Sequence, residues 1–119
     1  MAWTLDDSRP IWPQLSQQLA RQIIAGVYPP GSRLPSVREL AAEAGVNPNT
    51  MQRALAQLEQ EGLCRADRTA GLLVTGDTQV IEAVRRREAE GVIRQYLEGM
   101  AGLGYTREQA AELLKEECL

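Results

Sequence analysis

Four side chains that can hydrogen-bond to nucleobases occur within seven residues: Asn47, Asn49, Gln52 and Arg53. Asparagine and glutamine can each make two hydrogen bonds to adenine, and arginine can make two to guanine. Each such pair is worth roughly 1–3 kcal/mol of discrimination against a wrong base. Pro48 suits the first turn of a helix, where the N–H that proline lacks matters least. The segment predicts a helix start in which Asn47 either caps the helix or contacts DNA.

The elements before this segment are two short helices, each with one apolar face. Residues 13–26 carry leucine and isoleucine at helical spacing and end at a glycine. Ser36 and Glu39 have the spacing of a capping box, in which each side chain satisfies an unpaired backbone N–H of the other residue. This pattern predicts a second helix that begins after Ser36 and stops at Gly45. Only three residues, 45–47, then separate it from the next helix.

The third helix has its apolar residues on one face and ends at Gly62. Two short apolar segments, 63–66 and 72–75, then flank a five-residue loop, which is typical of a β-hairpin. Three short helices followed by a hairpin predict a winged helix-turn-helix. In that arrangement the third helix enters the DNA major groove, and the hairpin loop touches the flanking backbone or minor groove.

A long helix with one apolar stripe is predicted after Gly76. Residues 85–91 interrupt the stripe, so this stretch is either exposed or bent near Gly91. Thr106 and Gln109 form a second capping box, which predicts a final short helix. The stripe favours a dimer interface, and an intramolecular core is the alternative. Its expected dimerisation residues are Val80, Ile81, Val84, Ile93, Tyr96, Leu97, Met100, Leu103, Leu113 and Leu114.

The predicted fold class is therefore mainly α with a small β-hairpin. We expect a winged helix-turn-helix DNA-binding domain over residues 9–76 and a helical dimerisation tail over residues 77–119. A chain of 119 residues is long enough for one domain of ordinary size, or for a small domain with such an appendage.

Composition argues against several functional classes. The chain has no histidine, no glycine-rich phosphate loop, no nucleophile motif and no metal-ligand cluster, so we expect neither an enzyme nor a metal or cofactor site. Cys64 and Cys118 lie far apart, which argues against a disulfide scaffold. The amino terminus lacks the features of a signal peptide, and no segment approaches the ~20 apolar residues of a membrane span. We therefore expect a cytoplasmic protein without membrane association.

The net charge of −3 and the pI of about 5.0 argue at first against nucleic-acid binding. The charge is unevenly distributed, however. Residues 1–76 contain seven arginines and seven acidic residues, so the acidic excess lies in residues 77–119. The arginines of the first part are either collected on one binding surface or merely solvated, and charge alone favours neither.

Several motifs together resemble the GntR family of bacterial transcription regulators. They are Pro-Ile-Trp-Pro-Gln-Leu at 10–15, Gly26 to Gly31, Leu-Pro-Ser-Val-Arg-Glu-Leu-Ala at 34–41, Gly-Val-Asn-Pro-Asn-Thr at 45–50, Arg-Ala at 53–54 and Leu-Glu-Gln-Glu-Gly-Leu at 58–63. The Asn-Pro-Asn-Thr form and the short helical tail are similar to the YtrA-type subgroup. The resemblance is dense over residues 9–76 and looser in the tail.

This resemblance implies a homodimer that reads a palindromic operator in double-stranded DNA, most simply as a repressor. The DNA-binding residues expected here are Arg33, Ser36, Arg38, Asn47, Asn49, Thr50, Gln52, Arg53, Arg68 and Gly71. The wing of the family commonly reads Arg-Gly-Lys-Gly, whereas residues 68–71 read Arg-Thr-Ala-Gly. The resemblance therefore implies wing contacts only for Arg68 and Gly71.

Three alternatives stay open at this point. Arg38 and Arg53 could pair with neighbouring carboxylates, and Gln52 could be a solvated surface residue. The winged helix could instead assemble partner proteins without binding DNA. No small-molecule effector is indicated, and two tail helices cannot enclose a metabolite alone. An effector site would have to form between subunits, or between the tail and the winged helix.

Overall fold

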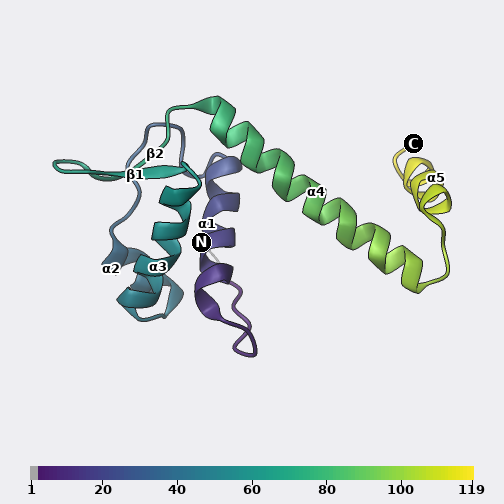
Figure 1. The fold of residues 1–119 in the computed structure, drawn as a ribbon, viewed down its shortest axis with the longest axis horizontal. Coiled ribbons are helices and arrows are strands. Elements are labelled where there is room, and N and C mark those ends of the chain that lie inside the picture. The colour runs from purple at the N-terminus through teal and green to yellow at the C-terminus, as the bar shows by residue number, and fades with distance from the viewer. Residues whose placement is uncertain (1–2) are drawn as a thin grey trace. The chain divides into compact units, whose positions relative to one another are not determined.

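The computed structural model describes residues 3–119. In order, the elements of this part are α1 (Ile11–Ile24), α2 (Val37–Ala44), α3 (Pro48–Gln60), β1 (Cys64–Asp67), β2 (Gly71–Val74), α4 (Thr78–Gly102) and α5 (Arg107–Glu117) (Figure 1). The predicted fold class, mainly α with one hairpin, is confirmed. The chain divides into two compact units, one ending at Arg85 and the other spanning Arg86–Leu119. The two units are described separately below.

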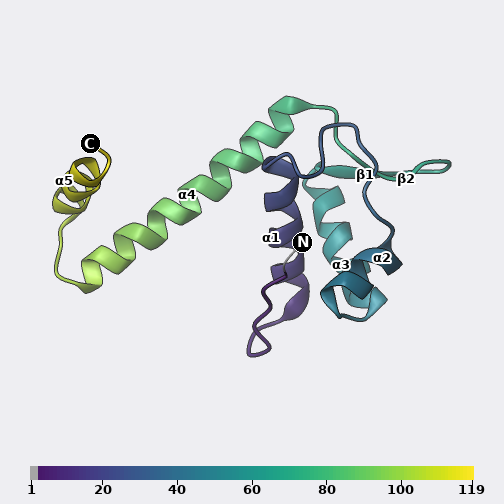
Figure 2. The ribbon, with the colours of Figure 1, turned by 180° about the vertical axis from the view of Figure 1, so that it is seen from behind.

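The core of the first unit is built from the apolar faces of its three short helices. Helix α3 packs against both α1 and α2, and α1 lies alongside it in both ribbon views (Figures 1 and 2). The largest fully buried side chains are Leu15, Leu19, Ile23, Leu34, Leu40, Met51, Leu55, Leu58, Leu63 and Val74. Burial of apolar surface stabilises a fold by roughly 25 cal/mol per Å². This core therefore holds α3 by one face and leaves its other face to solvent.

The hairpin pairs β1 and β2 in antiparallel register, from Cys64 opposite Val74 to Asp67 opposite Gly71. The segment before α2 adds a short extended edge to β2. The backbone N–H of Leu34 donates to the Leu72 carbonyl at 2.8 Å, and the N–H of Val74 donates to the Ser32 carbonyl at 2.8 Å. The base of the hairpin is thereby tied to the chain that leads into α2.

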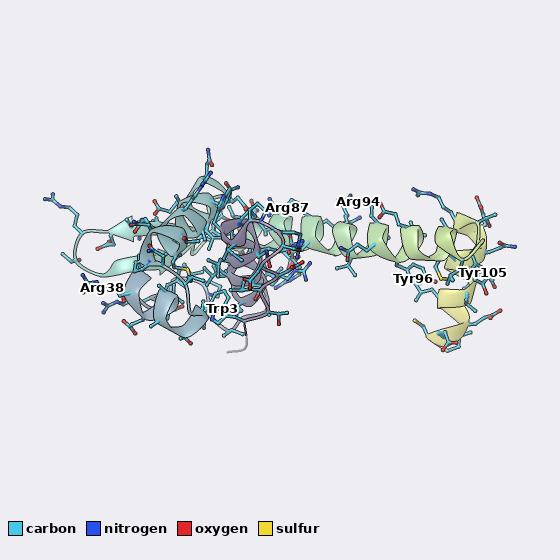
Figure 3. All side chains as sticks on the ribbon, turned by 90° about the horizontal axis from the view of Figure 1, so that it is seen from below. Trp3, Arg38, Arg87, Arg94, Tyr96 and Tyr105 are labelled. Carbon is cyan, nitrogen blue, oxygen red and sulfur yellow. The ribbon has the colours of Figure 1, made fainter. Side chains whose placement is uncertain are left out.

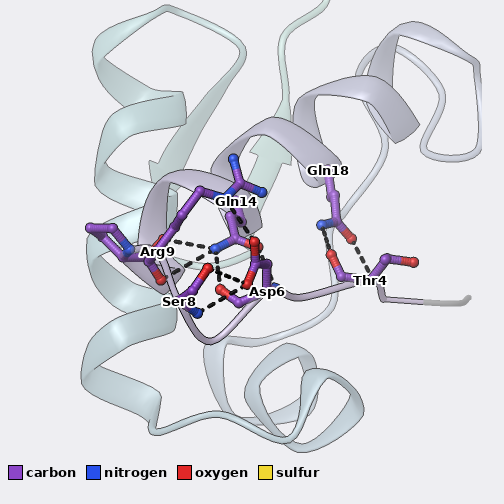
Figure 4. Close-up of polar contacts among 7 residues, drawn as sticks. Thr4, Asp6, Ser8, Arg9, Gln14 and Gln18 are labelled. Carbon is purple, nitrogen blue, oxygen red and sulfur yellow. Dashed lines mark hydrogen bonds and ion pairs between the residues drawn. The ribbon is translucent and has the colours of Figure 1, made fainter.

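A segment before residue 9 also belongs to this unit, although the sequence pattern places the domain start there. Two glutamines of α1 bind its backbone as a neighbouring strand would (Figure 4). Gln18 Oε1 accepts from the Thr4 N–H and Gln18 Nε2 donates to the Thr4 carbonyl, at 3.0 and 2.6 Å. Gln14 does the same for Asp6, at 2.7 and 2.9 Å. Two glutamine side chains, which no motif marks out, therefore hold the backbone of residues 4–6 against α1.

Three of the residues predicted to form a dimer interface pack in or against the core of the first unit. Ile81 and Val84 of α4 are only 5% and 6% exposed, and Val80 packs against the same cluster. Arg85 adds a polar tie, because its Nη2 donates to the Ile24 carbonyl at the end of α1 at 2.6 Å. In the single chain these three residues pack within the first unit, and their place in a dimer interface stays a prediction. Their apolar side chains bury the start of α4 within its own chain, so the first unit extends beyond residue 76.

The second unit contains the rest of α4 and helix α5. Helix α4 runs through Gly91 without ending, and the expected capping box of Thr106 and Gln109 begins α5. Tyr96 Oη donates to the Ala110 carbonyl at 2.7 Å, and Figure 3 shows the Tyr96 ring on the part of α4 that lies near α5. Ala110 is the one buried residue among the described residues of this unit.

Much of the apolar surface of the second unit stays in solvent. The large exposed side chains are Val92, Ile93, Leu103, Tyr105, Leu114 and Leu119. Of the other predicted dimerisation residues, Tyr96, Leu97, Met100 and Leu113 are half-buried. A two-helix unit thus leaves an apolar face uncovered. Among the described residues, no helix combines the length and the apolar character needed to cross a membrane.

Candidate DNA-binding surface

The start of α3 is capped as the sequence predicts. Asn47 has extended backbone angles, and its Oδ1 accepts from the Asn49 N–H at 2.8 Å. Pro48 occupies the first helical position, where its missing N–H leaves no gap in the helix. The cap takes up one lone pair of the Asn47 oxygen, and the NH₂ group of this side chain donates to no described residue, so it remains for a ligand. Of the two roles considered for Asn47, capping is therefore the one observed.

The polar side chains at this helix start face away from the core. Asn47, Asn49, Gln52 and Arg53 are exposed, and Thr50 is half-buried. Gln52 makes no hydrogen bond to any other described residue, so its amide is available to a ligand. Buried residues Met51, Ala54, Leu55 and Leu58 occupy the opposite face. A helix start also concentrates free N–H groups and a positive dipole end, which favour phosphate.

Arg53 has a partner that the sequence does not reveal. Its guanidinium carbon lies 4.7 Å from the centroid of the Trp12 ring on α1, a cation–π arrangement. Among the described residues no ion pair joins Arg53 to a carboxylate, and the guanidinium stacks on Trp12. Trp12 could not have been found by spacing, because the two residues belong to different helices.

The start of α2 presents a second helix end next to α3. Ser36 Oγ accepts from the Glu39 N–H at 3.1 Å, and Glu39 Oε1 accepts from the Ser36 N–H at 3.4 Å. The Ser36 hydroxyl keeps its own hydrogen for donation to a phosphate. Arg38 is exposed and has no ion-pair partner within residues 3–119, so its charge is not neutralised by Glu39 or Glu43. Figure 3 shows its side chain outside α2, at the end of the unit where the hairpin loop lies.

The hairpin loop is ordered by one aspartate that sequence reasoning passed over. Asp67 Oδ1 accepts from the Thr69 N–H, the Thr69 hydroxyl and the Ala70 N–H at 2.9, 2.9 and 3.0 Å. These bonds, led by that from the Thr69 backbone and aided by Arg65, lower the pKa of Asp67 to about 2. Asp67 and Thr69 have the spacing of an Asx turn, so a local signal did exist. The carboxylate fixes the loop that carries Arg68.

The three remaining wing residues lie on or beside this loop. Arg68 is exposed and makes no ion pair with other described residues. Gly71 has φ +83°, a left-handed conformation that glycine adopts without strain. A Cβ at this position would lie 3.6 Å from Nε of Arg33, so the Arg33 side chain crosses the loop base here. Arg33 is therefore placed beside the wing, whereas Ser36 and Arg38 belong to the start of α2.

Comparison with known proteins identifies the family of this chain. Residues 13–74 match the family described as "Bacterial regulatory proteins, gntR family". The chain is 31% identical to the HTH-type transcriptional regulator YhcF of Bacillus subtilis, over 91% of this chain and 89% of that protein. It is 41% identical to the transcriptional repressor YtrA of the same organism, over 57% of this chain and 52% of that protein.

A solved structure agrees over nearly the whole length. A GntR family transcriptional regulator from Listeria monocytogenes superposes with a TM-score of 0.84 at 35% identity, covering 94% of this chain and 98% of that one. The resemblance to the GntR family and to YtrA-type regulators is thus confirmed, as is the expectation of a regulator rather than an enzyme. The chain belongs to the GntR family of transcriptional regulators, with a DNA-binding helix-turn-helix.

Proposed function

We propose that this regulator acts as a homodimer that occupies a palindromic operator and represses the adjoining promoter in the cytoplasm. The observation that carries the proposal is the exposed polar start of α3, where Asn49 and Gln52 face solvent on a helix held by its opposite face. Their amides have the chemistry to read adenine in the major groove. The name of the related YtrA protein, a transcriptional repressor, supports the direction of control.

Phosphate contacts in this proposal come from the groups around α3. Arg38 and Ser36 act at the start of α2, and Arg33 and Arg68 act from the wing, with Gly71 allowing close approach of the loop backbone. Such contacts position a protein on the duplex without reading its sequence. The unpaired state of Arg38 and Arg68 supports this role, because neither guanidinium has to give up an ion pair to bind phosphate.

The second unit supplies the dimer contact in this proposal. Ile93 and Leu103 are 55% and 75% exposed, which is costly for large apolar side chains in an isolated two-helix unit. Pairing with the same surface of a second copy would bury them and would give the assembly two-fold symmetry. Two recognition helices could then meet half-sites about 34 Å apart, one turn of DNA.

Selection of duplexes from a random pool by the full chain tests this proposal. We expect the selected duplexes to share an inverted repeat, and scrambling one half-site to weaken binding strongly. Arg38→Ala should weaken binding to all sequences. The slope of log affinity against log salt concentration should also fall by about one, the value for one lost phosphate contact. Arg94→Ala, which removes an exposed arginine of the second unit, is the matched control and should bind like the wild type.

Two further measurements complete the test. Sedimentation at micromolar concentration should show a dimer, and transcription in vitro from a template carrying the selected site should fall when the chain is added. Selected duplexes without inverted symmetry, or a monomeric chain, would contradict the proposed assembly. Failure to bind any duplex at low salt would favour the alternative, a winged-helix module that binds only proteins.

A further inference from the structure

We propose that Arg53 is a positioning residue, which clamps α3 to α1 through Trp12 and does not itself contact DNA. This inference rests on the proposed function, because it concerns how the start of α3 meets a duplex. It assigns base reading to Asn49 and Gln52 alone. It also gives Trp12, which belongs to the family motif at residues 10–15 but to which the resemblance assigns no contact, a role in DNA recognition.

The first argument is the geometry of the pair. The Arg53 guanidinium lies 4.7 Å from the centre of the Trp12 ring, and indole is the best aromatic partner for a cation. Arg53 is exposed as a residue, so burial does not force this conformation on it. The attraction of the ring selects it from among the many rotamers open to a solvated arginine.

The second argument concerns the space over Asn49. A long side chain on a helix leans toward the helix amino terminus and covers the residue one turn earlier. For Arg53 that residue is Asn49. The stack with Trp12 draws the guanidinium toward α1, and this leaves the Asn49 amide uncovered for a base edge.

The third argument concerns the roll of α3 about its own axis. Successive helical residues point about 100° apart, so a modest roll would exchange one outward residue for another. The buried residues of α3 fix its deep face from Met51 to Leu58, and the stack between Arg53 and Trp12 adds an attachment on the side of the helix. A helix held in both places presents Asn49 and Gln52 to the groove in one orientation.

A double-mutant cycle in the full chain tests the proposal, with a duplex selected from a random pool by the wild type as the probe. Arg53→Ala and Trp12→Leu should each weaken binding about three- to tenfold. The double variant should bind no worse than either single one, because both changes break the same contact. The slope of binding against salt should stay that of the wild type in all three variants, because no phosphate contact is lost.

Two additional variants guard against a simple loss of folding. Arg53→Lys keeps a cation near the ring and should recover part of the affinity. In a Trp3→Phe background Trp12 is the sole tryptophan, so its emission should change on Arg53→Ala in the absence of DNA. Circular dichroism should show the same helix content in each variant.

A salt slope that falls by about one in Arg53→Ala would overturn the proposal, because it would place Arg53 on a phosphate. If the fold-losses in affinity of the two single variants multiply in the double variant, the proposal is also overturned, because the two residues would then act independently. In both cases the wild type still binds its duplex. A wild-type chain that binds no duplex instead overturns the proposed function, and with it this role of Arg53, so the two failures are distinguishable.

Discussion

The two units of this chain differ in how they bury apolar side chains. The first unit encloses leucines, isoleucines and valines from α1, α2, α3, the hairpin and the start of α4 in one core. The second unit buries only Ala110 among its described residues and leaves Ile93 and Leu103 in solvent. The first unit has a core of its own, which can fix the exposed face of α3 without contacts from the second unit. The second unit, in contrast, leaves large apolar side chains in solvent, which is the surface that the proposed dimer contact would cover.

Two isoleucines of the same helix provide the largest expected contrast. Ile81→Ala should lower the free energy of unfolding of the first unit by about 2–5 kcal/mol, because it leaves a cavity in the core. Ile93→Ala should change that free energy by less than about 0.5 kcal/mol, because Ile93 is exposed in the single chain. Both tryptophans lie in the first unit, so urea unfolding followed by fluorescence reports it directly. Equal losses in the two variants would contradict the division of α4 between a buried start and an exposed later part.

Tyr96→Phe should have a smaller effect, confined to the second unit. The change removes the hydrogen bond to the Ala110 carbonyl, and such a bond contributes about 0.5–1.5 kcal/mol. Amide hydrogen exchange should become faster in α5 and stay unchanged in α1 and α3. Faster exchange throughout the first unit would show that the two units are not independent in stability.

The smallest expected effect is a pH response of the hairpin loop. The pKa of Asp67 is lowered to about 2 in the folded chain from an ordinary value of 3.8. Its carboxylate therefore stabilises the loop fully above about pH 4, and this contribution is lost as the pH falls toward 2. The Thr69 amide resonance should move over this range in an NMR titration. Asp67→Asn keeps an acceptor oxygen and should abolish the movement, and a transition that persists in this variant would assign it to another group.

Features set by local spacing could be predicted from the sequence. The Asn47 cap, the two capping boxes and the hairpin each depend on residues a few positions apart, and all are observed. The strands pair out to Asp67 and Gly71, so the loop is residues 68–70 and is shorter than the predicted five residues. A periodic stripe shows which face of a helix is apolar but not what covers it. For this reason Ile81 and Ile93 received the same predicted role, although one lies in the core and the other in solvent.

Contacts between elements lay beyond sequence reasoning. The stack of Arg53 on Trp12 joins two helices, and Gln14 and Gln18 bind a segment that carries no motif. In none of these pairs are the two residues separated by a sequence spacing that a known motif would reveal. The identity of the candidate site residues could thus be predicted, whereas the partners that orient them required the structure.

The central claim is that the amino-terminal turns of α3, and not its later turns, enter the groove of the duplex. Two exposed glutamines of the same helix test it, Gln52 near its start and Gln60 at its end. The affinity of Gln52→Ala and Gln60→Ala should be measured on the selected duplex and on variants with one base pair changed. We predict that Gln52→Ala loses about tenfold in affinity and no longer discriminates at one base-pair position, while Gln60→Ala behaves like the wild type. Loss of discrimination in Gln60→Ala but not in Gln52→Ala would contradict the account.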